Sequence, residues 1–204
     1  TQLNTTDDWL RTGEIDKDSG EDCLYVNVFR PNSSKKLPVY VWIHGGSNNF
    51  GSAREYGGAE LAVRSDVVVV VVQYRLGPIG WFYHPALQSG TDAMSDSGNF
   101  GTLDTSQALR WIQKNIAAFG GDPNKVTVTG ESAGAHNTMN LVISPVAKGL
   151  FNAAMYESGG MAPVTANSGR ASANDYIEKL LMFADGVATP VPPATRAAYA
   201  QKRV

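Results

Sequence analysis

The chain of 204 residues has one cysteine, three histidines and almost balanced charge. A single cysteine, Cys23, excludes an internal disulfide and a cysteine-rich zinc site. The 17 basic and 19 acidic side chains give a net charge of −2, and the basic residues do not cluster, so we do not expect a nucleic-acid-binding protein. The longest apolar run, residues 67–72, is far shorter than the ~20 residues that cross a bilayer, so we expect no membrane span.

The amino-terminal segment has no targeting signal that we can identify. Its first ten residues lack the basic start and the apolar core of a signal peptide, although they could be the cut end of a longer precursor. Residues 1–21 are polar and rich in acidic side chains, and we interpret them as a surface loop. One cysteine does not fix the compartment; we favour a secreted or periplasmic location over a cytoplasmic one.

Apolar strand-like segments alternate with amphipathic helical segments along the rest of the chain. Residues 37–43 and 67–74 are apolar on both faces, which is typical of parallel strands covered by helices. Apolar residues at three- and four-residue steps predict a helix over 102–119. The other predicted elements are strands over 23–29, 126–129 and 153–156, helices over 56–64, 133–143 and 174–184, and an irregular segment over 78–100. This alternation predicts an α/β fold with a mainly parallel central sheet flanked by helices.

The segment Gly-Glu-Ser-Ala-Gly at 130–134 carries the strongest chemical signal. It fits the pattern G-x-S-x-G and lies directly after a predicted strand and before a predicted helix. A sharp turn there would expose the hydroxyl of Ser132, and the Ala133 N–H could donate a hydrogen bond to a tetrahedral oxyanion. The alternative is that a strand–helix junction matches the pattern by chance.

A second motif, His-Gly-Gly-Ser at 44–47, follows an earlier predicted strand. An oxyanion hole needs a second backbone donor that approaches the substrate without a Cβ in the way, and glycines after a buried strand supply one. Gly45 and Gly46 could instead be ordinary turn glycines. Two motifs in the right order and in matching contexts favour catalysis.

With these motifs the sequence resembles the type-B carboxylesterase/lipase family, which includes carboxylesterases, cholinesterases and fungal lipases of the α/β-hydrolase fold. The similarity runs from about residue 21 to residue 160 and is carried by six segments. They are EDCLYVNV at 21–28, VWIHGGS at 41–47, QYRLGPIGW at 73–81, GNFGTLDTSQALRWIQKNIAAFGGDP at 98–123, VTVTGESAG at 126–134 and SPVAKGLFNAAMYESG at 144–159.

The resemblance implies roles for particular residues. Ser132 would be the nucleophile, and the backbone N–H groups of Gly46, Ser47 and Ala133 would form the oxyanion hole. Arg75 and Asp104 would form a buried structural salt bridge, and no metal or organic cofactor would be needed.

Several positions depart from the family pattern. Ser47 replaces the third glycine of the oxyanion loop, Gln73 stands where asparagine is common, and glutamine is replaced by Thr105 and by Glu157. Cys23 corresponds to a cysteine that many eukaryotic members bridge to an upstream partner. No partner exists here, so we expect a free, buried thiol.

A catalytic acid and base are not apparent in the sequence. In α/β-hydrolases they follow the serine in the order acid, then histidine, and the only later histidine is His136, one turn into the nucleophile helix. We expect His136 to be a packing or polar side chain, His44 to brace the oxyanion loop and His84 to lie on a surface loop. Glu157, at the end of a predicted strand, is a conceivable acid.

We therefore interpret the chain as the amino-terminal portion of a single α/β-hydrolase domain. The acid and base would come from a later segment, on a second chain produced by cleavage or in residues not included here. The strands present would bury both sides of the 67–72 strand poorly and expose a large apolar face. Acidic residues near the last predicted helix should lie on its exposed face; these are Asp175, Glu178 and Asp185.

Two functions remain open. The first is a serine carboxylic-ester hydrolase that acts on a small-molecule ester through an acyl-enzyme intermediate. The second is a non-catalytic cholinesterase-like interaction module, although such members usually lose the nucleophile. Four aromatic residues could line an acyl or alcohol pocket, or could simply pack in the core; they are Trp81, Phe82, Tyr83 and Phe100.

Overall fold

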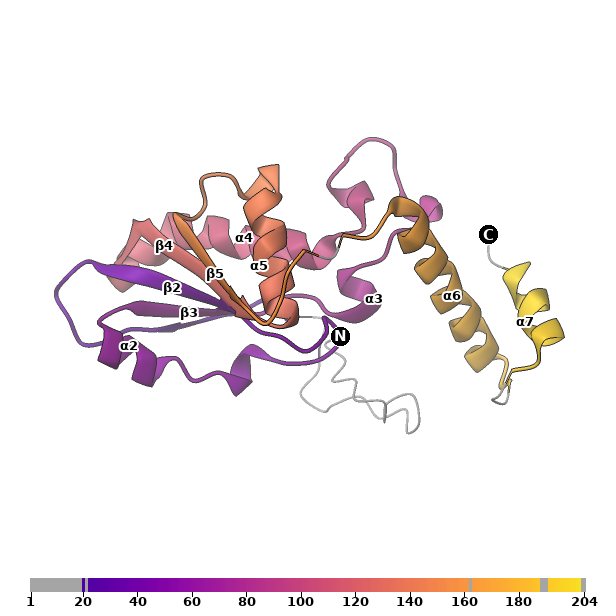
Figure 1. Ribbon diagram of the computed structural model, residues 1–204, viewed down its shortest axis with the longest axis horizontal. Coiled ribbons are helices and arrows are strands. Elements are labelled where there is room, and N and C mark those ends of the chain that lie inside the picture. The colour runs from indigo at the N-terminus through magenta and orange to yellow at the C-terminus, as the bar shows by residue number, and fades with distance from the viewer. Residues whose placement is uncertain (1–19, 21, 162, 188–190, 203–204) are drawn as a thin grey trace. The chain divides into compact units, whose positions relative to one another are not determined.

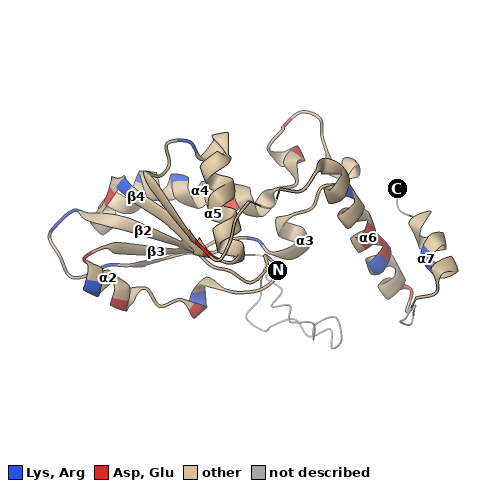
Figure 2. Cartoon of the chain, in the orientation of Figure 1, with Lys and Arg blue, Asp and Glu red and all other residues tan. Residues whose placement is uncertain are grey.

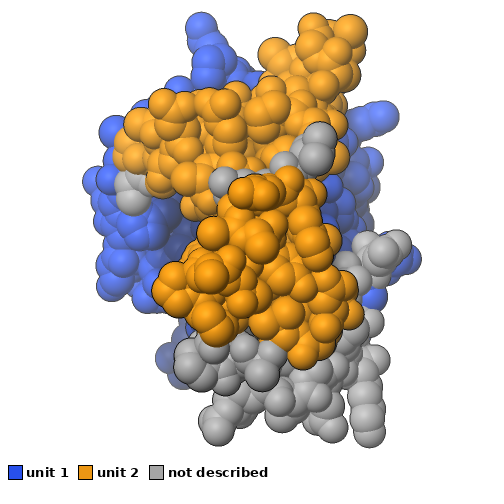
Figure 3. Space-filling view, turned by 90° about the vertical axis from the view of Figure 1, so that its right-hand side faces the viewer, with its two compact units in different colours: residues 1–80, 100–162 blue, residues 81–99, 163–204 orange. Residues whose placement is uncertain are grey.

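The computed structural model describes residues 20, 22–161, 163–187 and 191–202. The predicted surface loop over 1–21 lies almost wholly outside the described residues. The chain divides into two compact units, shown in separate colours in Figure 3. The first comprises residues 1–80 and 100–162, and the second comprises 81–99 and 163–204. That both belong to one domain stays a prediction.

The first unit is built on a five-stranded sheet in the order β1-β3-β2-β4-β5. The strands are β1 (Val26–Phe29), β2 (Leu37–Ile43), β3 (Val68–Val72), β4 (Gly121–Glu131) and β5 (Ala153–Glu157). All neighbours are parallel except β1, which runs antiparallel to β3. The predicted α/β fold with a mainly parallel sheet is confirmed.

Helices cover both faces of this sheet. In Figure 1, α4 and α5 lie on one side of the sheet and α2 lies on the other. The α-helices of this unit are α2 (Ala59–Ser65), α3 (Gly77–Gly80), α4 (Phe100–Asn115) and α5 (Ala133–Ile143), and the 3₁₀ helices are η1 (Ala53–Glu55), η4 (Ile116–Phe119) and η5 (Pro145–Ala147). On the predicted stripe of the 102–119 helix, Leu109, Ile112 and Ile116 are buried as expected. Phe119, the last residue of the predicted stripe, is 37% exposed at the end of η4, so the expectation is wrong for this residue.

The burial of the valine strand differs from the sequence-based expectation. Every residue of β3 is at most 2% exposed, because its two faces are packed against helices and its two edges are paired with β1 and β2. The expectation that this strand would be poorly buried is therefore wrong. The exposed strand is β5, which pairs with β4 and in which Met155 and Tyr156 are 43% and 49% exposed.

The second unit contains the 3₁₀ helices η2 (Pro85–Leu87) and η3 (Ser95–Ser97) and the helices α6 (Ala166–Ala184) and α7 (Pro193–Ala200). The helix predicted over 174–184 begins eight residues earlier, where the Thr165 side chain accepts a hydrogen bond from the Ser168 N–H and caps it. No helix was predicted over α7, because alanine, proline and threonine dominate the composition of this part of the chain.

Acidic residues of α6 form ion pairs, which Figure 2 shows as neighbouring red and blue segments. Asp175 pairs with Lys179 and with Arg196 of α7. The prediction that Glu178 lies on an exposed face is wrong: its residue is 5% exposed and its carboxylate lies 3.6 Å from the Arg196 guanidinium. None of the helices in the described part of the chain is long and apolar enough to cross a membrane.

Candidate active site

Ser132 lies in a strained turn between β4 and α5. Its φ of 53° and ψ of −118° are rarely adopted by a residue with a side chain. The turn is possible because its flanking glycines allow close backbone packing. A Cβ on Gly134 would lie 2.0 Å from the carbonyl oxygen of Ile43, and one on Gly130 would lie 2.4 Å from the Gly134 carbonyl carbon.

The backbone of Ser132 is fixed on both sides of the turn. Its N–H donates to the carbonyl oxygen of Glu157 at 2.9 Å, and its carbonyl accepts from the N–H groups of Ala135 and His136 at 3.0 and 3.1 Å. Among the described residues, the N–H of Ala133 finds no acceptor. This amide stands at the amino end of α5, where the helix dipole is positive.

The glycine-rich loop after β2 lies against the Ser132 turn. A Cβ on Gly45 would lie 3.2 Å from the Ser132 Cβ and 2.9 Å from the Glu131 carbonyl oxygen. Gly46 and Ser47 have φ values of 101° and 52°, and the Gly46 carbonyl accepts from the N–H groups of residues 49 and 50. Neither the Gly46 nor the Ser47 N–H donates a hydrogen bond within the part of the chain that the structure describes.

His44 supports this loop through a hydrogen bond to its backbone, as expected. The side chain is buried, and its Nδ1 lies 2.8 Å from the Gly45 carbonyl oxygen, to which it must donate. Its Nε2 lies 3.2 Å from the Gln73 side-chain nitrogen, which can only donate, so Nε2 accepts. Burial lowers the pKa of His44, in agreement with this neutral tautomer.

Gln73 is a structural residue whose role no motif in the sequence predicted. Its side-chain oxygen accepts from the Ala53 N–H at 2.8 Å while its nitrogen donates to His44. The only sequence signal was its departure from the asparagine that is common in similar proteins.

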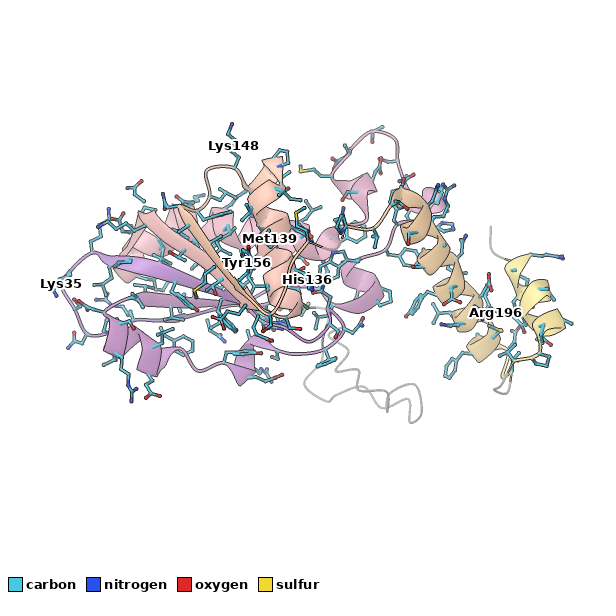
Figure 4. All side chains as sticks on the ribbon, in the orientation of Figure 1. Lys35, His136, Met139, Lys148, Tyr156 and Arg196 are labelled. Carbon is cyan, nitrogen blue, oxygen red and sulfur yellow. The ribbon has the colours of Figure 1, made fainter. Side chains whose placement is uncertain are left out.

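The other two histidines also have backbone partners. His136, labelled on α5 in Figure 4, has its Nδ1 within hydrogen-bond distance of both the N–H and the carbonyl of Gly160. Because one nitrogen cannot donate and accept at once, the tautomer decides which bond forms. His84 belongs to the second unit, where its Nδ1 accepts from the Ala86 N–H at 3.2 Å and caps η2.

The predicted salt bridge is present but only partly buried, because the Arg75 side chain is 36% exposed, and the predicted free thiol is present as well. The Arg75 guanidinium donates two hydrogen bonds of 2.7 Å to Asp104, and the Arg75 N–H adds one of 3.1 Å. Cys23 is free and buried, and burial raises the pKa of its thiol.

The aromatic residues proposed for a pocket have packing partners. Phe82 contacts Tyr176 edge to face with ring centroids 6.3 Å apart, and the Arg75 guanidinium lies 5.3 Å from the centre of the Phe100 ring. These contacts favour the core-packing alternative for Phe82 and Phe100. The described residues contain no cluster of three or more histidine, cysteine, aspartate or glutamate side chains that could hold a metal ion.

A serine in a strained strand–turn–helix, beside a glycine loop that follows a neighbouring parallel strand, defines the α/β-hydrolase class. Solved structures agree. One titled "thermophylic PNB esterase" matches 98% of this chain and 42% of its own at a TM-score of 0.76 and 38% identity. Another, titled "PNB esterase", matches 90% of this chain and 39% of its own at a TM-score of 0.73 and 39% identity.

The sequence comparisons define the family. The model of the carboxylesterase family matches residues 3–187, and the chain belongs to this family. It is 47% identical over 163 residues to the para-nitrobenzyl esterase of Bacillus subtilis (strain 168), covering 78% of this chain and 32% of that protein. It is 49% identical over 142 residues to the human cocaine esterase, covering 68% of this chain and 24% of that protein. The chain thus spans a quarter to a third of the length of these relatives.

Proposed function

We propose that this chain carries the nucleophile and the oxyanion hole of a serine carboxylic-ester hydrolase. The Ser132 hydroxyl loses its proton to a general base as its oxygen attacks the ester carbonyl. The resulting oxyanion accepts hydrogen bonds from the N–H groups of Gly46, Ser47 and Ala133. When the tetrahedral intermediate collapses, the alcohol leaves with the proton that the general base had taken from Ser132. The acyl-enzyme that remains is then hydrolysed by water.

The observation that carries this proposal is the strained Ser132 backbone next to three amides without acceptors in the described structure. Strain of this kind costs free energy, of order 1–3 kcal/mol per residue, and is kept where the surrounding structure enforces it. Here the glycine contacts at 130 and 134 enforce it. Charge stabilisation by fixed amides requires no metal or organic cofactor.

We further propose that the general base and the acid come from polypeptide outside these 204 residues. Both ring nitrogens of His44 are bonded, and the Nδ1 atoms of His84 and His136 have backbone partners. The limited coverage of the relatives, 32% and 24% of their lengths, is consistent with further segments. Glu157 is the alternative acid within this chain, since it is exposed at the end of β5 and its carbonyl holds the Ser132 N–H.

The substrate that we propose is a small-molecule carboxylic ester. The para-nitrobenzyl esterase and the cocaine esterase are named for esters of this kind.

Covalent labelling tests the proposal. The whole protein, with all segments that accompany this chain, is treated with a fluorophosphonate probe, and the modified peptide is identified by mass spectrometry. We expect one phosphonylated site at Ser132, loss of hydrolysis of p-nitrophenyl acetate on labelling, and neither label nor activity in the Ser132→Ala variant. An unmodified Ser132, under conditions that label a control esterase, would favour the non-catalytic interaction module.

A further inference from the structure

Asn48 and Asn137 form a reciprocal pair of side-chain hydrogen bonds. The Asn137 Nδ2 donates to the Asn48 Oδ1 at 2.8 Å, and the Asn48 Nδ2 donates to the Asn137 Oδ1 at 3.4 Å. Asn137 is 1% exposed, and Asn48 is half-buried. A buried side-chain amide costs free energy unless its polar atoms are bonded, so this pair satisfies groups that would otherwise destabilise the fold.

The pair joins the two parts of the proposed oxyanion hole. Asn48 directly follows Ser47, and Asn137 lies on α5, the helix that begins next to Ser132. The pair therefore connects the loop that offers two amides to the helix that offers the third. Asn48 has a φ of 57°, which asparagine tolerates better than most residues.

Neighbouring contacts support the same arrangement. The Asn48 carbonyl accepts from the Gly77 N–H at 2.6 Å, which holds the outer end of the loop. The Tyr74 hydroxyl donates to the His44 carbonyl at 2.6 Å, at the inner end of the loop. Burial raises the pKa of Tyr74, so the hydroxyl stays a donor at neutral pH.

We propose that Asn48 and Asn137 are positioning residues that hold the Gly46 and Ser47 amides at the distance from Ser132 that the oxyanion requires. The inference rests on the proposed function. Removing a whole oxyanion-hole donor lowers kcat by a factor of about 10²–10³. Loosening the loop leaves the donors present but less well placed, so we expect a loss of about tenfold in kcat, below that range.

A double-mutant cycle in the whole protein tests the pair. The variants are Asn48→Gly, which removes the amide and accepts the positive φ, Asn137→Ala, and the two combined. The control is Asn115→Ala, which removes a partly buried asparagine bond of 2.8 Å to the Trp111 carbonyl within α4. The readouts are kcat and KM for p-nitrophenyl acetate, the Ki of a trifluoromethyl ketone, which forms an oxyanionic hemiketal with the serine, and the midpoint of thermal unfolding.

We expect kcat to fall about tenfold in each single variant while KM changes less than about twofold, since the amides act on the transition state. The affinity for the trifluoromethyl ketone should fall in parallel with kcat. The double variant should be no worse than the poorer single variant, because one shared interaction is lost only once. Asn115→Ala should keep the wild-type kcat and Ki.

Three results would overturn the inference. They are wild-type kcat and Ki in Asn48→Gly, a kcat loss without a loss of ketone affinity, or losses that multiply in the double variant. If Asn137→Ala fails to fold, Asn48→Gly decides alone, because that site is a half-buried loop. Ser132→Ala separates the two proposals: if it keeps activity, the proposed function fails, whereas if it is inactive and Asn48→Gly is unaffected, only the positioning role fails.

Discussion

The substitution Gly134→Ala tests whether the close packing beneath the serine turn is real. A Cβ at this position would lie 2.0 Å from the Ile43 carbonyl oxygen and 2.8 Å from that of His44, against the 3.4–4 Å of ordinary contact. Both oxygens belong to the backbone of β2 or its continuation, which is buried and paired on both edges. Neither oxygen can rotate away as the end of a flexible side chain would.

Two opposing effects set the size of the change. Gly134 is the second residue of α5, where the preference for alanine over glycine is at most the ~1 kcal/mol of a helix interior. Overpacking a rigid interior costs ~1–3 kcal/mol and sometimes more, and an overlap with two backbone oxygens belongs at the upper end. We therefore expect a net destabilisation of about 2 kcal/mol or more, which is a large part of the ~5–15 kcal/mol that stabilises a typical domain.

Urea unfolding followed by circular dichroism, with and without the substitution, gives this number from the midpoint at unchanged slope. The control is Gly57→Ala, because a Cβ there meets nothing within 4 Å and the backbone has no positive φ. It should change stability by less than about 0.5 kcal/mol. A Gly134→Ala variant as stable as the wild type, or more stable, would refute the close approach of α5 to β2.

Three further predictions follow from single contacts. Asp104→Asn should destabilise the protein by about 2–3 kcal/mol, less than the ~3–5 kcal/mol of a fully buried pair because the Arg75 side chain is 36% exposed, and an unchanged urea midpoint would contradict the structural role. His44 has a folded pKa below its unfolded value of 6.5, so its contribution to stability is present above about pH 6.5 and is lost as the pH falls through the folded pKa. NMR should place the midpoint of this ring's titration below pH 6.5, and a midpoint at or above 6.5 would contradict its burial. Glu157→Gln should leave kcat nearly unchanged if the acid lies outside this chain, whereas a loss of several orders of magnitude would identify Glu157 as the acid.

The sequence predicted the sheet because its strands are distinct in composition. Residues 37–43 and 133–143 form β2 and α5 with the predicted bounds, since an unbroken apolar run and a glycine-flanked helix start are local signals. The antiparallel pairing of β1 with β3 was not predicted, because pairing direction depends on contacts between Val26 and Val72, far apart in the chain. The burial of Glu178 was missed for the same reason, because its partner Arg196 belongs to α7.

In the candidate site, too, the residues marked by local motifs were predicted, and those defined by contacts between distant parts of the chain were not. Ser132, Gly46, Ser47 and Ala133 were assigned from two short motifs together with the resemblance to a known family, and the structure brings Gly45 and Ser132 together. No sequence motif predicts the role of Gln73 or of the Asn48–Asn137 pair. The paired asparagines are separated by 89 residues, and in the sequence either could be an ordinary polar side chain. Only their positions in space assign them a shared role.

A crystal structure of the whole protein after reaction with the fluorophosphonate probe would test the central claim most directly. The account predicts phosphorus bonded to the Ser132 oxygen and a phosphonyl oxygen within ~2.7–3.1 Å of the amide nitrogens of Gly46, Ser47 and Ala133. A phosphonyl oxygen turned to solvent, or one bonded to side chains instead of these amides, would contradict it.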